Sequence, residues 1–152
     1  MMKQTFTPEQ LFEKLNVAWN EARGDRAMPR RAEINPVKLG SALQQVSLVD
    51  VLAGNPVDFR YRLIGQQLIR AYGRNITGET HLSVFQKTSP KTFYDGFLRC
   101  TQAKEPQFMT TNFRNANNTP CRAQAGVWPL SDDQGTVTGL LIGCMYLMAE
   151  VG

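Results

Sequence analysis

Histidine is almost missing from this sequence of 152 residues, since only His81 occurs. One histidine does not supply a conventional multi-histidine metal site, and we expect no bound metal. The sequence also lacks the motifs GxGxxG, GxxxxGKS/T, GxSxG and HExxH, which cradle phosphates or position a nucleophile or a zinc ion. We find no nucleophile–base pair and therefore assign no catalytic residue, so we expect that the chain is not an enzyme.

Cysteine is scarce and long apolar runs are missing. Cys100, Cys121 and Cys144 are widely spaced and form no CxxC pair, which argues against a disulfide scaffold or a zinc site. Free thiols are typical of a reducing compartment. No run approaches the roughly 18 apolar residues that span a bilayer, and the first residues lack the apolar region of a signal peptide. We therefore expect a cytoplasmic protein that does not associate with a membrane.

Charge of one sign is in slight excess. The net charge is +4, from 17 Lys and Arg against 13 Asp and Glu. Five positive side chains gather in one segment, at Arg23, Arg26, Arg30, Arg31 and Lys38. This segment has neither interleaved aromatic residues nor a nucleic-acid motif, so we interpret it as a solvated basic loop and do not expect nucleic acid as a partner.

An amphipathic helix is predicted near the N-terminus. Thr7 and Gln10 have the spacing of a capping box, and apolar residues follow at helical spacing. An apolar stripe of this width must be covered, either by the chain's own domain or by a second copy of the chain. We expect a homodimer, with Leu11, Leu15 and Trp19 as its interface.

A β-hairpin is predicted in the next part of the chain. Two runs rich in β-branched and aromatic residues, 46–52 and 58–64, flank a Gly-Asn-Pro turn. In the second run Phe59, Tyr61 and Leu63 alternate with two arginines and an isoleucine. We expect these three side chains to share the buried face of a strand.

The order of all the predicted elements indicates an α+β fold. Later helices are expected at 66–72 and from a cap at Ser89 and Pro90 to about 103, and later strands at 107–114, 122–130 and 137–148. The last strand is apolar on both sides, which is typical of the centre of a sheet. We expect a five-stranded antiparallel sheet with helices on one face. The chain would divide into an N-terminal helix with a basic linking segment (1–35) and a sheet domain (36–152).

This order, with its residues, resembles a PAS domain, and is most similar to the single-domain PAS_5 family of alphaproteobacteria. The similarity covers about residues 11–147 and rests on short motifs: Trp19 with Arg23-Gly24, MPRRA (28–32), LVDV (48–51), DFRYRLIG (58–65), YGR (72–74), TG (77–78) and WPLSDD (128–133). The resemblance implies a sensory or interaction module. It implies neither a particular ligand nor an enzymatic activity.

A small molecule would fit between the sheet and the helices that cross it. The candidate wall residues for ligand binding are Tyr61, Leu63, Leu68, Tyr72, Phe93, Phe97, Trp128, Leu141 and Met145. The alternative is that these residues simply fill a solid core, as buried apolar residues usually do.

The cofactor stays unknown. Heme-binding PAS proteins use an axial histidine, but His81 lies at the edge of a predicted turn, and we interpret it as solvent-facing or capping. Flavin-binding light sensors of the PAS class carry a reactive cysteine in a helical Asn-Cys-Arg motif. Here Cys121-Arg122 follows Pro120 and opens a strand, so the sequence does not support flavin photochemistry.

Three functions remain open. The leading hypothesis is a cytoplasmic PAS-type regulatory domain that binds a small apolar or amphipathic metabolite or a partner protein. It would signal through dimerisation to a downstream signalling protein. The second hypothesis is a protein-interaction module with a filled core and no ligand. The third, a small α+β enzyme, is weakened by the missing nucleophile–base pair.

Overall fold

The computed structural model of the chain describes residues 6–85 and 91–148. Its helices are α1 (Pro8–Arg23), α2 (Pro36–Leu39), α3 (Gln66–Tyr72), α4 (His81–Phe85) and α5 (Thr92–Ala103), with 3-10 turns at Arg31–Glu33 and Gly40–Gln45. Its strands are β1 (Val46–Leu52), β2 (Asp58–Ile64), β3 (Gln107–Arg114), β4 (Pro120–Ser131) and β5 (Val137–Met148). Ser89 and Pro90, the predicted cap of α5, lie outside the described residues.

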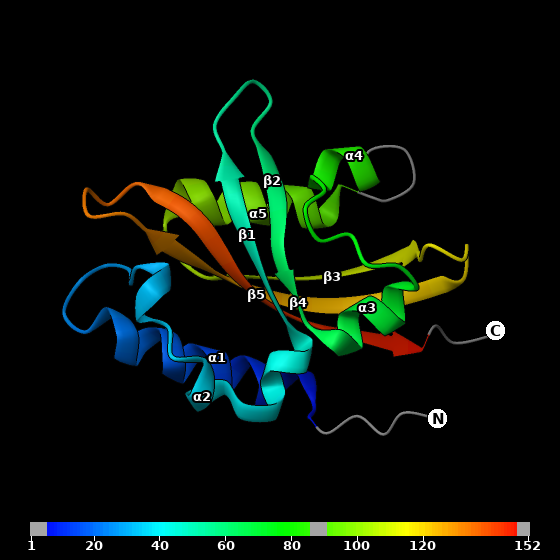
Figure 1. Ribbon diagram of the computed structural model, residues 1–152, viewed down its shortest axis with the longest axis horizontal. Coiled ribbons are helices and arrows are strands. Elements are labelled where there is room, and N and C mark those ends of the chain that lie inside the picture. The colour runs from blue at the N-terminus through cyan, green and yellow to red at the C-terminus, as the bar shows by residue number, and fades with distance from the viewer. Residues whose placement is uncertain (1–5, 86–90, 149–152) are drawn as a thin grey trace.

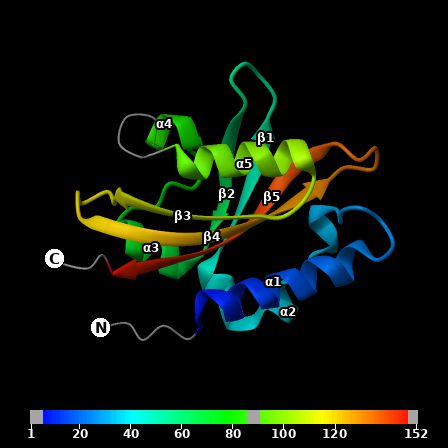
Figure 2. The same cartoon turned by 180° about the vertical axis from the view of Figure 1, so that it is seen from behind.

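The strands form one antiparallel sheet in the order β2-β1-β5-β4-β3. The predicted five-stranded antiparallel sheet and the α+β fold class are therefore confirmed. β5 lies in the middle, paired with β1 along one edge and with β4 along the other, and its residues 139–145 are buried on both faces of the sheet, as its apolar sequence predicts. Helices α3, α4 and α5 lie on one face, and α1 and α2 lie on the other (Figures 1 and 2).

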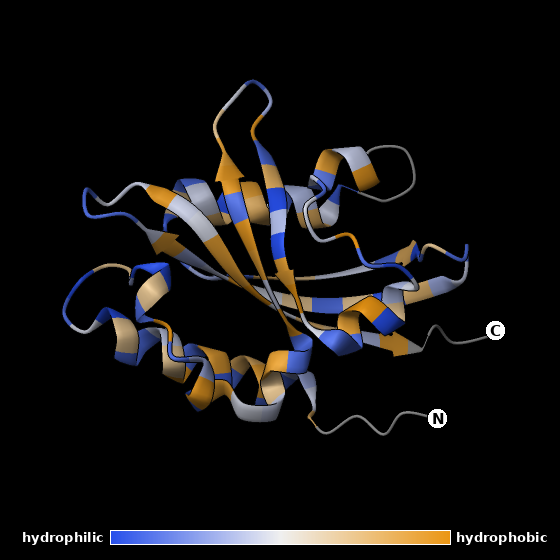
Figure 3. Ribbon diagram, in the orientation of Figure 1, coloured by the Kyte–Doolittle hydropathy of each residue, from blue (hydrophilic) through white to orange (hydrophobic). Residues whose placement is uncertain are grey.

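Helix α1 begins with the predicted capping box. The Gln10 amide donates to the Thr7 hydroxyl at 3.1 Å, and the Thr7 amide donates to the Gln10 side chain at 3.0 Å. Its apolar face packs on β4 and β5, and the ribbon coloured by hydropathy shows apolar and polar residues interleaved along the helix (Figure 3). Leu11 and Leu15 are 0% exposed and Trp19 is 6% exposed.

This packing corrects the predicted dimer interface. Leu11, Leu15 and Trp19 are covered by the chain's own sheet, which was the other of the two ways to bury the stripe. The Trp19 indole donates to the carbonyl of Pro129 at 2.8 Å, and the Trp128 indole donates to Asn16 at 3.2 Å. These two hydrogen bonds and the buried leucines fix α1 on β4.

A β-bulge changes the facing of residues at the end of β2. The register runs from Leu48 opposite Leu63 to Val49 opposite Tyr61, so Arg62 has no partner residue on β1. An extra residue turns the following side chains to the opposite faces. Leu63 is therefore 44% exposed, and the prediction that it shares the buried face of Tyr61 is wrong.

The hairpin joins α3 through a close approach of two backbone segments. Gly65 has φ −62° and ψ 149°, which is an extended conformation and not a left-handed turn. A Cβ atom at Gly65 would overlap the backbone carbonyl of Gln44. Gly73 has φ 93° and ends α3 in a left-handed conformation, which glycine adopts without steric cost.

Candidate functional site

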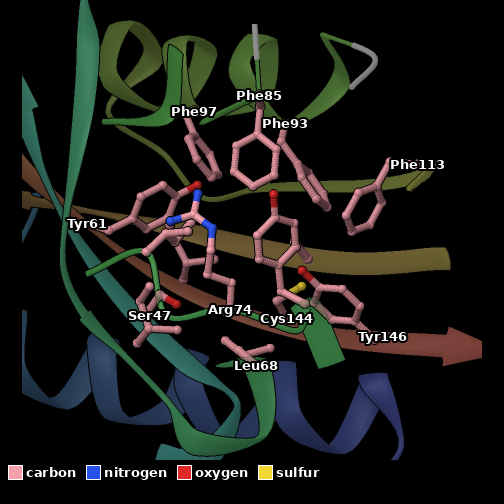
Figure 4. Close-up of a pocket in the computed structure, with 15 residues that line it drawn as sticks. Ser47, Tyr61, Leu68, Arg74, Phe85, Phe93, Phe97, Phe113, Cys144 and Tyr146 are labelled. Carbon is pink, nitrogen blue, oxygen red and sulfur yellow. The ribbon is translucent and has the colours of Figure 1, made fainter. Parts of the chain in front are cut away.

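A cavity of about 60 Å³ lies between the sheet and helices α3, α4 and α5 (Figure 4). Seven of the fifteen residues that line it are aromatic, and several of these rings meet edge to face. The rings of Tyr72 and Phe85 lie 5.4 Å apart, and those of Phe113 and Tyr146 also lie 5.4 Å apart. The Phe93 and Phe97 rings stack at 6.3 Å. Such a wall favours an apolar ligand, because it offers mainly dispersion contacts.

Five of the nine predicted wall residues line this cavity. They are Tyr61 from β2, Leu68 and Tyr72 from α3, and Phe93 and Phe97 from α5. They meet because α3 and α5 lie on the face of the sheet toward which Tyr61 points. Whether they bind a ligand stays a prediction.

The other four predicted wall residues do not line the cavity, and their placement is corrected. Leu63 is turned outward by the bulge in β2. Trp128 contacts Phe12 of α1, with ring centroids 6.3 Å apart, on the opposite face of the sheet. Leu141 and Met145 share that opposite face, because side chains alternate along β5 and Ile142 and Cys144 line the cavity.

Sequence reasoning missed much of the wall. Ile142, Cys144 and Tyr146 come from β5, Phe113 comes from β3, and Arg74 follows α3. The alternation along β5 would have grouped the first three residues on one face, but every residue near them is apolar or glycine, so the pattern did not say which face holds the cavity. The pairing of Phe113 with Cys121 across β3 and β4 was not readable from the sequence.

A buried polar pair lies behind the aromatic wall. The Tyr61 hydroxyl and the Nδ1 atom of His81 are 2.8 Å apart, and either group can donate, depending on the tautomer of the imidazole. His81 is 4% exposed and its ring contacts Phe85 at 4.7 Å and Phe97 at 5.3 Å. Interpreting His81 as a solvent-facing or capping residue is therefore wrong. Its place at the start of α4 turns it toward β2.

Burial keeps four titratable groups in or beside the cavity neutral. It lowers the pKa of His81 to about 4 and raises the pKa of Cys144 to about 12. It also raises the pKa of the Tyr61 and Tyr146 hydroxyls well above the usual range. At neutral pH these four groups hydrogen-bond or pack as uncharged side chains.

Comparison with known proteins places this arrangement in a family. The PAS_5 family model, described as a PAS domain, matches residues 8–146. The chain belongs to the PAS domain family. This confirms the resemblance drawn from the sequence motifs, and the match includes α1, which packs on the sheet. None of the curated proteins matches the sequence at a significant level.

Solved structures share the PAS fold at low sequence identity. A light-oxygen-voltage domain whose mechanism was studied with a flavin analogue has a TM-score of 0.58 at 16% identity, over 77% of this chain and 88% of that chain. The PAS domain of the fruit-fly ELK potassium channel has a TM-score of 0.57 at 11% identity, over 75% and 94%. The light-oxygen-voltage domain of a blue-light-activated histidine kinase from Erythrobacter litoralis has a TM-score of 0.53 at 11% identity, over 68% and 95%.

The cavity of this PAS domain does not fit a flavin. Its volume of about 60 Å³ is below the roughly 150 Å³ that holds one benzene ring, and a flavin has three fused rings. The cysteine in its wall, Cys144, lies on the central strand and is a neutral thiol.

A heme does not fit this PAS domain either. A heme is far larger than the cavity of about 60 Å³, and the His81 ring is enclosed by Phe85 and Phe97. Within residues 6–85 and 91–148, no group of three or more His, Cys, Asp or Glu side chains is placed to hold a metal ion.

The described helices include none that is long and apolar enough to cross a membrane.

Proposed function

We propose that this PAS domain is a cytoplasmic regulatory domain that binds a small, mainly apolar molecule between the sheet and helices α3 to α5. The observation that supports the proposal best is the cavity itself, because well-packed interiors contain few voids larger than a water molecule. An empty cavity costs stability, and a ligand that fills it regains the lost contacts.

The signal would pass through β5 to α1. Ile142 and Cys144 face the cavity, while Gly143 between them faces α1 so closely that a Cβ atom there would overlap the Leu15 side chain. A ligand that displaces β5 therefore changes the surface on which α1 rests. A homodimer and a downstream signalling protein are part of this proposal. While α1 is docked, the homodimer would use a surface other than the stripe of Leu11, Leu15 and Trp19.

A second candidate is an interaction module without a ligand. The small volume of the cavity and the edge-to-face contacts of its aromatic rings favour this reading. An enzyme is not proposed, because the buried Cys144 thiol is neutral and the described residues of the cavity wall place no general base beside it.

Native mass spectrometry of freshly purified protein separates the two candidates. A stoichiometric extra mass that disappears after denaturation is expected if the domain is a sensor. A chain mass without any addition, in protein purified from several growth conditions, would favour the ligand-free module.

A further inference from the structure

Arg74 is the one charged residue among those that line the cavity in the described part of the chain. It stands directly after Gly73, which ends α3, and its side chain is 48% exposed. Figure 4 shows this side chain extending toward the aromatic rings that α4 and α5 contribute. The guanidinium thus borders both water and the apolar interior.

The ion pair between Arg74 and Glu79 leaves N–H donors of the guanidinium available for a second anion. Nη1 of Arg74 donates to Oε2 of Glu79 at 2.6 Å, and the Glu79 side chain is 41% exposed. An ion pair this exposed contributes little to stability. A guanidinium has five N–H donors, so Nε and Nη2 remain for another acceptor.

The surroundings of Arg74 are suited to a negatively charged group. Tyr72 and Arg74 also line a surface hollow that Arg114 borders from the end of β3. The Arg114 guanidinium donates to the neutral carbonyl of Asn118 and forms no ion pair among the described residues. Inside the cavity, the Ser47 side chain is 5% exposed, and its hydroxyl has no hydrogen-bond partner in the described residues. A buried hydroxyl without a partner is costly, and a polar ligand atom would satisfy it.

We propose that the ligand is a short aliphatic carboxylate, with its chain among the aromatic rings and its carboxylate on Arg74. This inference rests on the proposed function and adds the chemistry of the ligand. The volume of about 60 Å³ is well below the roughly 150 Å³ of a cavity that holds benzene, so the aliphatic chain has only a few carbon atoms. A single negative charge fits better than a phosphate dianion, because Glu79 would repel the second charge.

The test compares pentanoate with pentan-1-ol, which has the same chain and no charge. Two-dimensional amide NMR titrations of the full chain give both dissociation constants. We expect pentanoate to bind about tenfold tighter than pentan-1-ol, because its carboxylate forms a charge-assisted hydrogen bond with Arg74. Arg74→Gln should remove this difference and leave pentan-1-ol binding unchanged. Glu79→Gln should strengthen pentanoate binding, because it removes the competing carboxylate.

Arg122→Gln is the matched control. Arg122 is exposed on β4 and lies on the opposite face of the sheet from Ala125, which lines the cavity. This variant should bind both probes as the wild type does. Equal affinity for the two probes, or pentanoate binding that survives Arg74→Gln, would overturn the proposal that the ligand is a carboxylate. The proposal that the cavity binds a ligand would still stand. Neither probe binding, with propanoate, propan-1-ol, butanoate and butan-1-ol also failing to bind, would overturn both the carboxylate and the proposed function.

Discussion

The hydrogen bond between Tyr61 and His81 joins β2 to α4 in an apolar environment. The imidazole is neutral there because burial lowers its pKa from 6.5 to about 4. In the unfolded chain the imidazole takes up a proton near pH 6.5, whereas the folded protein does so near pH 4. Stability from this residue is therefore fully present above pH 6.5 and is lost as the pH falls through 4.

We expect the free energy of unfolding to drop by about 3 kcal/mol between pH 7.5 and 4 on account of His81. Urea unfolding at several pH values measures this loss. His81→Gln does not titrate, and its side-chain oxygen can still accept from Tyr61, so the variant should lose much less stability over the same range. Equal pH dependence in the two proteins would show that His81 is not responsible.

Gly73 is a second residue whose substitution has a predictable result. Its φ of 93° is strained for any residue with a Cβ atom, and a Cβ there would lie 2.6 Å from the Asn117 side chain. Gly73→Val should therefore destabilise the fold by about 1–3 kcal/mol. Differential scanning calorimetry measures the effect, and an unchanged melting temperature would count against a left-handed helix end at this position.

Strand β5 and helix α1 show what the sequence patterns could predict and what they could not. The pattern placed both elements and their types correctly, and it placed β5 at the centre of the sheet. The alternation could not assign the faces of β5, because both faces are apolar, and the bulge at Arg62 could not be seen in the sequence. Equally, the apolar stripe of α1 required a cover but did not say which surface supplies it.

The packing of α1 predicts the result of truncating Leu15. This side chain is 0% exposed and lies against Gly143, so Leu15→Ala should cost about 2–5 kcal/mol. Val17→Ala, at a position that is 46% exposed on the same helix, is the control and should change stability by less than about 0.5 kcal/mol. Urea unfolding of the two variants gives the comparison. If Leu15→Ala left stability unchanged but dissociated a dimer, the stripe would be an interface between copies instead.

The whole molecule has three layers, with α1 and α2 on one face of the sheet and α3 to α5 on the other (Figure 1). The predicted division into 1–35 and 36–152 stays a prediction. Because α1 packs on the sheet, we expect that residues 36–152 do not fold stably without it. A fragment of residues 36–152 would expose the face that holds Trp128, which is 0% exposed in the whole chain. We expect this fragment to aggregate or unfold, as light scattering and circular dichroism would show. A soluble fragment with the unfolding midpoint of the full chain would support the division at 35.

Binding of xenon tests the cavity most directly, because xenon enters apolar cavities without any specific contact. The measurement is the change in methyl NMR signals with xenon pressure in the full chain. We predict shifts at Leu68 and Ile142, which line the cavity, and none at Val17. In Ala125→Leu the added side chain fills the cavity, so the protein should stay folded and the shifts should vanish. Methyl signals of Leu68 and Ile142 that do not respond to xenon in the wild type would show a solid core and contradict the proposed ligand site.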